Sequence, residues 1–253
     1  MKILKYKKGV QGLYKVDLED GTVLSLYEEV ILKYNLLLTK NIDDDIKEEM
    51  FASNLEYEVY YAALNSIKSR NKSEYDLRRF LLNKEYPVDL IDKALNKLIE
   101  QGYLNDRFFA KSYISNQMIT SVYGPLRIQK ELFDKNIDSK IIYEELEVFT
   151  EDEQLIKIDK IIRKGIKSNK NRGSSVLKQK IFNDLKNYGY DTYVINKVFD
   201  DYEFNGNDNE IAKKEYEKLY AKYSRKYSGY ELEKKIKEKL YLKGLKYEPN
   251  END

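Results

Sequence analysis

The side chains of Asn105, Asp106 and Arg107 place an amide, a carboxylate and a guanidinium next to one another, between the aromatic residues Tyr103 and Phe108. Because carboxylates can transfer protons in catalysis, the trio could form a catalytic cluster. Each of these residue types also has an ordinary role where a helix begins, as a cap or as a charge in the first turn. The elements on either side decide between a catalytic site and a joint between two helices.

The segment before the trio predicts a helix. Its apolar residues have the spacing of one helix face, at Leu90, Ile91, Ala94, Leu95 and Leu98. Gly102 suits the left-handed C-cap that ends such a helix, and Asn105 or Asp106 would cap the next one. We therefore interpret the trio as a joint and predict no catalytic residue there.

The composition removes the usual means of catalysis. The 253 residues include neither Cys nor His, which excludes disulfides, thiolate metal sites, cysteine nucleophiles and histidine bases. The triplet Asp43, Asp44 and Asp45 could ligate a hard cation, but carboxylates also complement the dipole at a helix N-terminus, which we favour. The sequence therefore predicts a non-enzymatic protein without cofactor or metal.

The length allows one large domain or two ordinary ones, and 42% hydrophobic with 35% charged residues predicts a core under a highly charged surface. No segment approaches the ~20 apolar residues that span a membrane, and the N-terminus lacks the apolar run of a secretory signal. We expect a cytoplasmic protein that does not associate with membranes.

Charge is distributed unevenly along a chain whose formal net charge is only +1. Residues 41–60 contain seven acids and one base, whereas residues 157–186 contain ten bases and two acids, and residues 213–246 twelve bases and five acids. The basic remainder could approach a polyanion or an acidic protein face. A solvated helix surface explains the same pattern equally well.

The first 42 residues predict a small β-hairpin followed by a short helix. Apolar residues alternate over 14–18 and over 22–26, around a turn at 19–21. A three-residue loop keeps both apolar sets on one face and places Gly21 in the left-handed region. Ser25 is then the expected N-cap of the short helix.

The chain beyond residue 42 is helical and repetitive. A long helix is expected to start after Asp43 and to run toward Ile67. Four later segments share two apolar residues four apart, then a turn position four residues on, then another apolar residue. The second apolar positions recur every 51 to 55 residues and are Leu81, Leu132, Leu185 and Leu240.

The turn positions of this repeat are Glu85, Asn136, Gly189 and Gly244. Glycine and asparagine suit a left-handed C-cap, so Glu85 is the exception, and Pro87 is expected to end its helix instead. Helix starts are marked by Ser73, Thr150 and Ser228, each followed by an acid three residues on.

The repeat predicts a mainly α protein in which tandem three-helix repeats form an elongated curved solenoid, preceded by a small N-terminal β-hairpin. The expected boundaries are 1–42 for the hairpin and short helix, 43–104, 105–149 and 150–204 for three repeat modules, and 208–253 for an incomplete fourth module.

Three segments of the repeat resemble the RecX family, the regulators of the bacterial RecA recombinase. They are "SEYDLRRFLLNKEY", "LIDKALNKLIEQGYLNDRFFAKSYI" and "GPLRIQKELFDKNI". The strong resemblance covers about Ser69 to Ile137, whereas the third and fourth modules match only in pattern. Glu85 and Asn136 stand where the family usually has glycine. The hairpin and the extra C-terminal module are similar to the longer form of the family.

The resemblance implies a role in DNA repair by homologous recombination and in the SOS response. It implies a non-enzymatic inhibitor that binds in the groove of the RecA filament on single-stranded DNA and bridges protomers. Such binding restrains ATP hydrolysis, strand exchange and filament growth. The implied partner is the RecA filament, direct contact with single-stranded or double-stranded DNA stays open, and we expect a monomer.

Exposed basic residues on the repeated helices are the candidates for partner binding, since the apolar positions are used in packing. These candidates are Arg78, Arg79, Arg127, Lys130, Arg163, Lys164, Arg172, Lys178 and Lys180. A row of basic side chains could follow a filament groove or a phosphate backbone. For any single residue, a solubilising role explains the charge as well.

Two other classes of function stay open. Three-helix units with basic helices also suit a DNA-binding regulator with helix-turn-helix-like modules. Against it, no module has a helix rich in the Arg, Asn and Gln that read base edges. A generic helical-repeat scaffold for another protein is the third reading.

Overall fold

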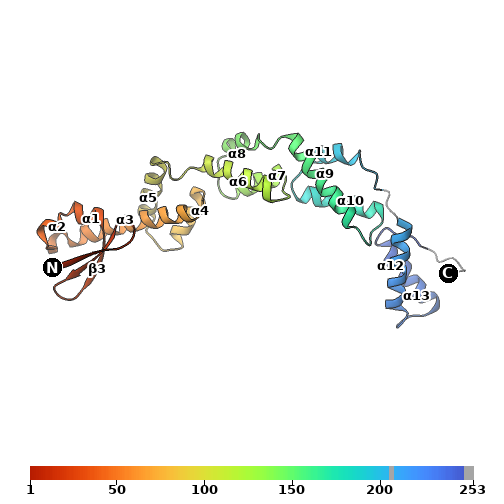
Figure 1. The fold of residues 1–253 in the computed structure, drawn as a ribbon, viewed down its shortest axis with the longest axis horizontal. Helices are drawn as coiled ribbons and strands as arrows, with labels where there is room; N and C mark the ends of the chain where they lie inside the picture. The colour runs from red at the N-terminus through yellow and green to blue at the C-terminus, as the bar shows by residue number, and fades with distance from the viewer. Residues whose placement is uncertain (205–207, 248–253) are drawn as a thin grey trace. The chain divides into compact units, whose positions relative to one another are not determined.

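The computed structural model describes residues 1–204 and 208–247, so the end of the predicted fourth module, 248–253, lies outside the described residues. The chain forms two compact units, and the red to yellow part of Figure 1 contains most of the first. Unit 1 comprises Met1–Ala110 and Lys135–Ile137, and unit 2 comprises Lys111–Asp134 and Asp138–Asp253.

Unit 1 begins with an antiparallel sheet in the order β1-β2-β3. Its strands are β1 (Ile3–Lys8), β2 (Leu13–Leu18) and β3 (Val23–Tyr27). The predicted hairpin is confirmed as β2 and β3, with Val16 opposite Leu24 and Tyr14 opposite Leu26. Gly21 has a φ of 84°, as the predicted three-residue loop requires. The sheet is larger than predicted, because β1 pairs with β2 as a third strand.

The short helix after the sheet does not start as predicted. Ser25 lies inside β3 and caps nothing, and α1 (Glu28–Lys33) begins after Tyr27, whose side chain makes no cap bond. Instead, Asn54 holds this corner from a distant helix: its Oδ1 accepts from Tyr27 N at 2.9 Å and its Nδ2 donates to Ser25 O at 3.0 Å. A tertiary contact therefore replaces the predicted local cap.

The sheet packs against α1, α2 (Leu36–Thr39) and the first half of α3 (Asp44–Ser69). α3 is the predicted long helix. Asp44 and Asp45 lie in its first turn, as expected for carboxylates that complement the dipole. Asp43 occupies the N-cap position, but its side chain accepts a hydrogen bond from Asn41 rather than from the helix.

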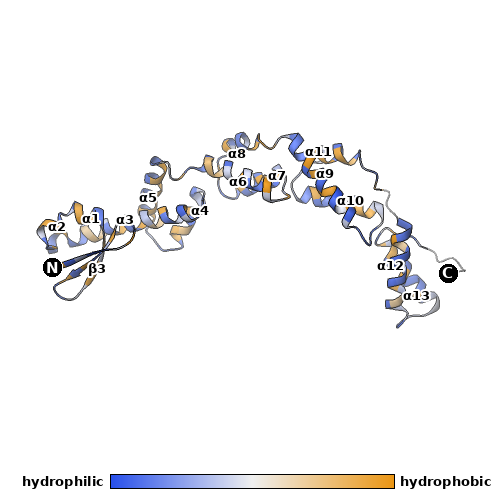
Figure 2. Cartoon of the chain, in the orientation of Figure 1, coloured by the Kyte–Doolittle hydropathy of each residue, from blue (hydrophilic) through white to orange (hydrophobic). Residues whose placement is uncertain are grey.

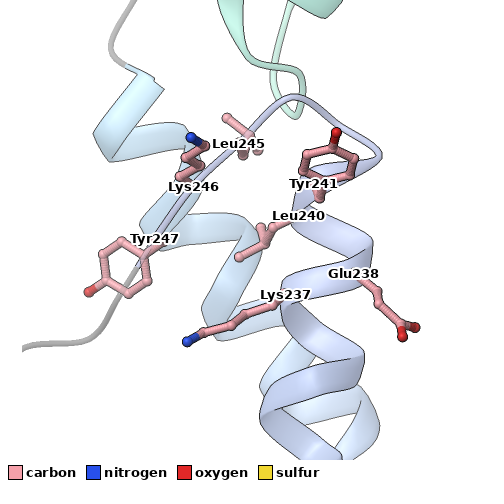
Figure 3. A pocket seen from close by; sticks show the side chains of 7 residues that line it. All are labelled: Lys237, Glu238, Leu240, Tyr241, Leu245, Lys246 and Tyr247. Atoms are coloured by element: carbon pink, nitrogen blue, oxygen red, sulfur yellow. The ribbon is translucent and has the colours of Figure 1, made fainter.

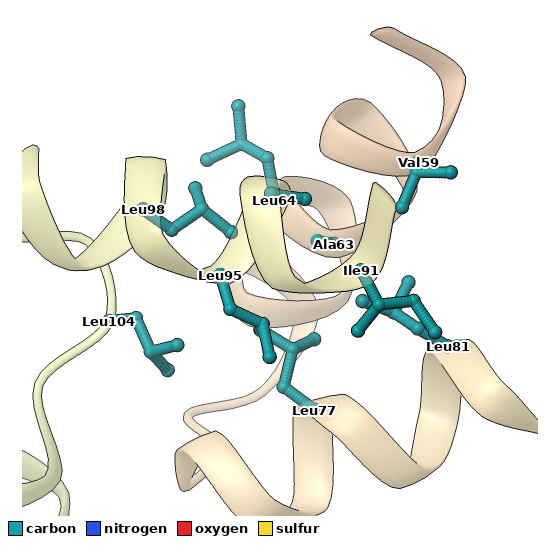
Figure 4. Packing of buried hydrophobic residues seen from close by; sticks show 10 residues of the cluster. Val59, Ala63, Leu64, Leu77, Leu81, Ile91, Leu95, Leu98 and Leu104 are labelled. Carbon is teal, nitrogen blue, oxygen red and sulfur yellow. The ribbon is translucent and has the colours of Figure 1, made fainter. Parts of the chain in front are cut away.

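The second half of α3 forms a separate core with α4 (Glu74–Leu82) and α5 (Val88–Glu100). Figure 4 shows side chains from the three helices pointing toward one another. The buried members are Val59, Ala63, Leu64, Leu77, Leu81, Ile91, Ala94, Leu95, Leu98 and Leu104. All of them except Leu104, which lies in the loop after α5, come from the helix faces that the sequence spacing predicts, so burial of those faces holds the three helices together.

The helices of the remaining chain confirm the mainly α fold class. They are α6 (Asp106–Thr120), α7 (Pro125–Phe133), α8 (Ser139–Leu146), α9 (Glu151–Ser168), α10 (Ser174–Asn187), α11 (Thr192–Phe199), α12 (Asp208–Tyr223) and α13 (Gly229–Tyr241). α6 begins in unit 1 and ends in unit 2.

We refer to α4, α7, α10 and α13 as the repeat helices. Their paired apolar residues are at most 3% exposed: Leu77, Leu81, Ile128, Leu132, Ile181, Leu185, Ile236 and Leu240. All four turns that follow are left-handed, with φ of 61° at Glu85, 57° at Asn136, 88° at Gly189 and 72° at Gly244. Glu85 is therefore not the exception that the sequence suggested.

Of the three N-caps predicted at helix starts of the repeat, two are confirmed. The Ser73 hydroxyl accepts from Asp76 N at 3.1 Å, and the Thr150 hydroxyl accepts from Glu153 N at 3.4 Å. Ser228 stands at the N-cap of α13 but makes no side-chain cap bond, and the next residue, Gly229, has a φ of 51°. A left-handed residue directly after Ser228 changes the direction of the chain, which explains the missing cap.

The turns after α10 and α13 each hold the start of an earlier repeat helix in unit 2. Gly124, the N-cap of α7, donates to Tyr188 O at 2.8 Å, and Gly173, the N-cap of α10, donates to Lys243 O at 2.8 Å. A Cβ added to Gly124 would lie 2.6 Å from Gly189 O. At both joints the two backbone segments are in direct contact. A residue with a Cβ at Gly124 or Gly173 would overlap the opposite backbone, so only glycine fits at these two positions.

Unit 1 contains a third joint, which is built from side chains. Lys135 Nζ lies 2.6 Å from Asp76 Oδ2, so the residues beside the Asn136 turn are held against the start of α4. Lys135–Ile137 accordingly belong to unit 1, although the residues on either side belong to unit 2.

Figure 2 shows hydrophilic as well as hydrophobic residues along the longer helices, α10 and α12 among them. Among the residues that the structure describes, no helix is both long and apolar enough to cross a membrane.

Candidate functional site

The trio Asn105, Asp106 and Arg107 is confirmed as a joint between helices. Asn105 Oδ1 accepts from Phe108 N at 2.9 Å and so caps α6. Asp106 Oδ1 accepts from Glu74 N at 2.8 Å and caps a different helix, α4. Burial raises the pKa of Asp106, and the Glu74 N–H opposes that shift.

The same joint recurs in unit 2, which the sequence analysis did not find. Asp208 begins α12 and accepts from Ser174 N and Ser174 Oγ at the start of α10, at 3.0 and 2.8 Å. Both aspartates start the helix that follows a three-helix group. The sequence did contain a signal for this joint: Asp106 and Asp208 lie about a hundred residues apart, and each stands at the start of an equivalent helix.

The two candidates in unit 1 differ in accessibility. Arg78 pairs with Glu74 at 3.5 Å and with Asp92 of α5, so it ties α4 to α5. The hydrogen bond with Asp92 raises the pKa of Arg78. Arg79 is exposed and lies over the Tyr75 ring at 5.6 Å. Arg79 is therefore the better placed of the two to meet a partner.

Arg127 and Lys130 lie on α7 in unit 2, and both are exposed. Arg127 Nε donates to Glu131 Oε1 at 2.9 Å, and its guanidinium lies 5.1 Å from the centre of the Tyr123 ring. The Tyr113 hydroxyl donates to the other oxygen of Glu131 at 2.7 Å. Arg127 is thus held in place by a carboxylate, while Lys130 extends from the next turn.

Arg163 and Lys178 lie on α9 and α10 beside aromatic rings of unit 2. Arg163 pairs with Asp159 at 2.7 Å and lies 5.9 Å from the Tyr202 ring. The Arg163 guanidinium and then the Tyr202 hydroxyl hold the pKa of Asp159 below its usual range. Lys178 lies 5.6 Å from the Phe204 ring. Neither residue lines the groove that brings three other candidates together.

The remaining three candidates, Lys164, Arg172 and Lys180, line one groove of about 230 Å³ in unit 2. Residues of α9, of α10 and of the loop 169–173 between them line it, together with Val122 and Tyr188. Apolar residues, among them Ile161 and Leu177, form part of its lining. Three cations chosen from sequence are therefore brought together by the packing of two helices. We call this the α9–α10 groove.

Two local features build the α9–α10 groove. Gly165 on α9 faces Ile181 on α10 so closely that an added Cβ would lie 2.7 Å from Ile181 Cδ1, which brings the helices together. Asn169 then fixes the loop, because its Oδ1 accepts from Arg172 N at 3.1 Å and its Nδ2 donates to Arg172 O at 2.6 Å. The backbone of Arg172 is thereby held at the rim.

The charges of the α9–α10 groove favour an anion. Its lining contains three cations and one carboxylate, Asp184, which pairs with Lys180. The groove also offers polar groups that the sequence analysis missed, on Ser168, Asn169 and Tyr188. Among the residues that the structure describes, no group of three or more acidic side chains is arranged to hold a metal ion. The arrangement can therefore bind phosphates or carboxylates by charge and hydrogen bonds.

Comparison with known proteins gives one consistent family. Residues 105–146 match the family model described as RecX, second three-helix domain. A regulatory protein RecX of Bacillus velezensis is 31% identical over 96% of this chain and 93% of its own length. One of Halalkalibacterium halodurans is 30% identical over 91% of this chain and 88% of its own length.

Solved structures agree with the relatives. A crystal structure of regulatory protein RecX superposes with a TM-score of 0.64, at 23% identity, and covers 79% of this chain and 100% of its own. The structure of RecX from Lactobacillus salivarius superposes with a TM-score of 0.55, at 26% identity, over 59% of this chain and 97% of its own.

Proposed function

This chain belongs to the RecX family of regulatory proteins, and from that premise we propose that it is a non-enzymatic modulator, mainly an inhibitor, of the RecA recombinase. It binds in the groove of the RecA filament on single-stranded DNA and restrains ATP hydrolysis, strand exchange and filament growth. A RecA partner places this activity in the cytoplasm.

The observation that carries the proposal is the α9–α10 groove, where Lys164, Arg172 and Lys180 line one cavity. A RecA filament on DNA presents phosphates and acidic side chains, and both suit these cations. Lys and Arg attract phosphates without reading base sequence. This fits a regulator that must act on filaments formed on any DNA sequence.

The absence of Cys and His from the sequence supports a non-enzymatic role, since it removes the commonest nucleophile and base. Two members of the trio that could have been catalytic, Asn105 and Asp106, cap helices instead. Inhibition then depends on binding alone, through contacts that hold RecA protomers in one arrangement.

Repeated basic positions extend the proposed binding surface beyond one groove. Arg79 and Lys130 both stand two residues after the first apolar residue of a repeat helix, and Arg127 and Lys180 both stand one residue before it. Each such position contributes a weak contact. Linked weak contacts multiply in effect, because the first bound contact raises the effective concentration of the others.

The test replaces Lys164, Arg172 and Lys180 by Gln together and measures inhibition of RecA ATP hydrolysis on single-stranded DNA. We expect the concentration for half inhibition to rise about tenfold or more, because the loss of about 1.4 kcal/mol of binding energy already has that effect. Raising the salt concentration should narrow the difference from wild type, since exposed charges are screened within about 8 Å at physiological ionic strength.

The matched control replaces Lys160, Lys167 and Lys186 by Gln. These exposed lysines lie on the same two helices, do not line the groove, and change the net charge by the same amount. Circular dichroism checks that both triple variants fold. Equal inhibition by the two variants would show that net charge, rather than the α9–α10 groove, determines binding.

A further inference from the structure

Two of the repeat helices carry the same kind of exposed row on one face. On α4 the row is Tyr75, Arg79 and Leu82, and on α7 it is Leu126, Lys130 and Phe133. The spacing i, i+4 and i+7 places the three residues of each row along one helix face. The rows are equivalent, because each begins two residues before the first apolar residue of the buried pair. We call them the α4 row and the α7 row.

The apolar residues of both rows are open to solvent. Tyr75 and Leu82 are 37% and 44% exposed, and Leu126 and Phe133 are 51% and 43% exposed. Next to the α7 row, the Tyr143 ring of α8 lies 6.5 Å from the Phe133 ring and is 59% exposed, so it enlarges the apolar surface. Each row therefore offers apolar contacts on both sides of an exposed base.

The base of each row is available to a partner. Nearby acids are already used in ion pairs, which are Glu74–Arg78, Asp76–Lys135 and Glu131–Arg127. Asp134 stands one turn after Lys130, but no ion pair joins the two. Among the residues that the structure describes, no carboxylate pairs with Arg79 or with Lys130, and Arg79 lies instead over the Tyr75 ring of its own row. A carboxylate of a partner would complement either charge.

The other two repeat helices show that the fold does not require such a row. The equivalent residues are Gln179, Asn183 and Lys186 on α10, and Lys234, Glu238 and Tyr241 on α13, where Figure 3 shows the last two. All six are exposed, but neither helix has an apolar residue at the first position or a base at the second. Single exposed apolar residues are common on protein surfaces. The same pattern at equivalent positions of two helices, where packing demands none, indicates an interaction surface.

We propose that the α4 row and the α7 row form a duplicated docking surface, and that each row binds the same site on one of two identical protein subunits. That site is an apolar pocket flanked by a carboxylate. The apolar residues of the row enter the pocket, and Arg79 or Lys130 pairs with the carboxylate. The inference rests on the proposed function, since a RecA filament offers identical subunits in succession.

The composition of the rows favours a protein partner over a nucleic acid. Binding to a phosphate backbone depends on several bases that neutralise successive phosphates, as in the α9–α10 groove. Each row has only one base, between two apolar residues. Aromatic residues and arginine around an apolar centre are typical of protein interfaces. The rows and the α9–α10 groove thus have different chemistry and suit different parts of a filament on DNA.

Duplication explains how two small surfaces can be sufficient. A single row contributes few side chains, so its contact with one subunit is weak. When both rows bind joined subunits, the first contact raises the effective concentration of the second, and the overall affinity rises by ~10²- to 10⁴-fold. On separate subunits there is no such gain, because one row is enough to occupy one subunit.

The test removes one row at a time from the full chain. Arg79→Glu with Leu82→Ser removes the α4 row, and Leu126→Ser with Lys130→Glu removes the α7 row. We expect each double variant to bind filaments of RecA, single-stranded DNA and a non-hydrolysable ATP analogue about tenfold or more weakly than wild type, measured by co-sedimentation titration. Circular dichroism checks folding, and Lys130→Glu alone takes the place of the α7 variant if that variant unfolds.

The matched control is Asn183→Glu with Lys186→Ser. These exposed residues stand at the equivalent positions of α10, do not line the α9–α10 groove, and change the net charge by the same amount as each row variant. We expect the control to bind filaments as wild type does.

A second titration tests whether the two rows share one site. Labelled RecA, kept dilute without DNA or nucleotide so that few subunits are joined, is titrated with the chain and followed by fluorescence anisotropy. Both row variants should bind within about twofold of wild type, because either row can occupy a separate subunit. The variant without both rows should lose this binding.

Four results would overturn the proposal. They are row variants that bind filaments as tightly as the control, a difference of about tenfold or more between the two row variants on separate subunits, an equal loss of binding to single-stranded DNA alone, and self-association of wild type that the row variants abolish. In the first three cases wild type still binds filaments, so the proposed function stands. Wild type that fails to bind filaments would refute the proposed function itself.

Discussion

The turns at Asn136 and Gly189 follow equivalent repeat helices. Each turn contacts the start of the preceding repeat helix, but the two contacts are made by different groups. At Gly189 the joint is made by backbone, since Gly124 N donates to Tyr188 O at 2.8 Å and Leu126 N donates to Gly189 O at 3.1 Å. Asn136 belongs to unit 1, where the neighbouring Lys135 pairs with Asp76 at 2.6 Å.

The difference teaches why only some of the turns need glycine. All four turn residues are left-handed, including Glu85 and Asn136, so the sign of φ alone does not demand glycine. At Gly189 an added Cβ would overlap the backbone N and the Cβ of Arg127, and at Gly244 it would lie 2.6 Å from Val176 Cγ2. Close approach of another chain segment, rather than φ, therefore selects glycine in unit 2.

The largest effect is expected from Gly189→Ala. Its Cβ has no room beside the backbone of Arg127, so the joint must shift, and the left-handed φ of 88° adds strain. We expect a loss of about 3 kcal/mol or more in the free energy of unfolding, measured by urea denaturation.

Gly102→Ala is the matched control, since Gly102 also ends a helix with a φ of 73° but has nothing within 4 Å of an added Cβ. We expect it to cost about 1 kcal/mol, the strain of the left-handed region alone. If the two variants lost the same stability, φ and not close approach would select glycine.

A smaller effect of opposite sign is expected from Glu85→Gly. Glu85 is exposed and has a φ of 61°, which costs a residue with a Cβ about 1 to 2 kcal/mol. Glycine removes that strain but makes the unfolded chain more flexible, so the net gain should be about 1 kcal/mol or less. A loss of stability on thermal unfolding would mean that the Glu85 side chain makes a contact that outweighs the strain.

The smallest effect concerns pH, and it should appear in both units. Burial, and then a hydrogen bond to a carboxylate, raises the pKa of Tyr86 in unit 1 and of Tyr113 in unit 2 to about 12. In the unfolded chain these tyrosines ionise near pH 10. The folded state holds both protons longer, so stability is full below pH 10 and falls as the pH rises from 10 to 12.

Unfolding by urea at pH 9 and at pH 11 measures this loss. Tyr86→Phe and Tyr113→Phe should each reduce the difference between the two pH values, because phenylalanine does not ionise. An unchanged pH dependence in both variants would assign the alkaline loss to other groups.

Much of the fold could be predicted from sequence because it depends on local spacing. The paired apolar residues of the repeat helices, the hairpin register and the left-handed turns at Asn136, Gly189 and Gly244 follow from residues close together in the chain. The left-handed turn at Glu85 was missed, because its residue type does not favour that conformation. The first strand was missed because its sequence lacks a regular alternation of apolar and polar residues. Only Ile3 of its six residues is buried in the structure. The wrong cap at Ser25 reflects Asn54, which acts from a helix that no local pattern connects to it.

The candidate site could be predicted only as a set of residue types. Sequence selected nine basic residues, but three of them meet only because α9 packs closely on α10 across Gly165. Arg78 was selected by the same rule, although it pairs with Asp92 inside a three-helix group. Which cations are free to meet a partner depends on tertiary neighbours, and one-dimensional spacing does not contain that information.

The most direct test of the central claim is co-sedimentation of the purified chain with RecA, single-stranded DNA and a non-hydrolysable ATP analogue. Parallel tubes contain RecA alone and DNA alone at the same salt concentration. The account predicts that the chain sediments with the complete filament and much less with either component. Equal retention by DNA alone would contradict it and would favour a DNA-binding regulator, while no retention by the filament would refute the RecA partner.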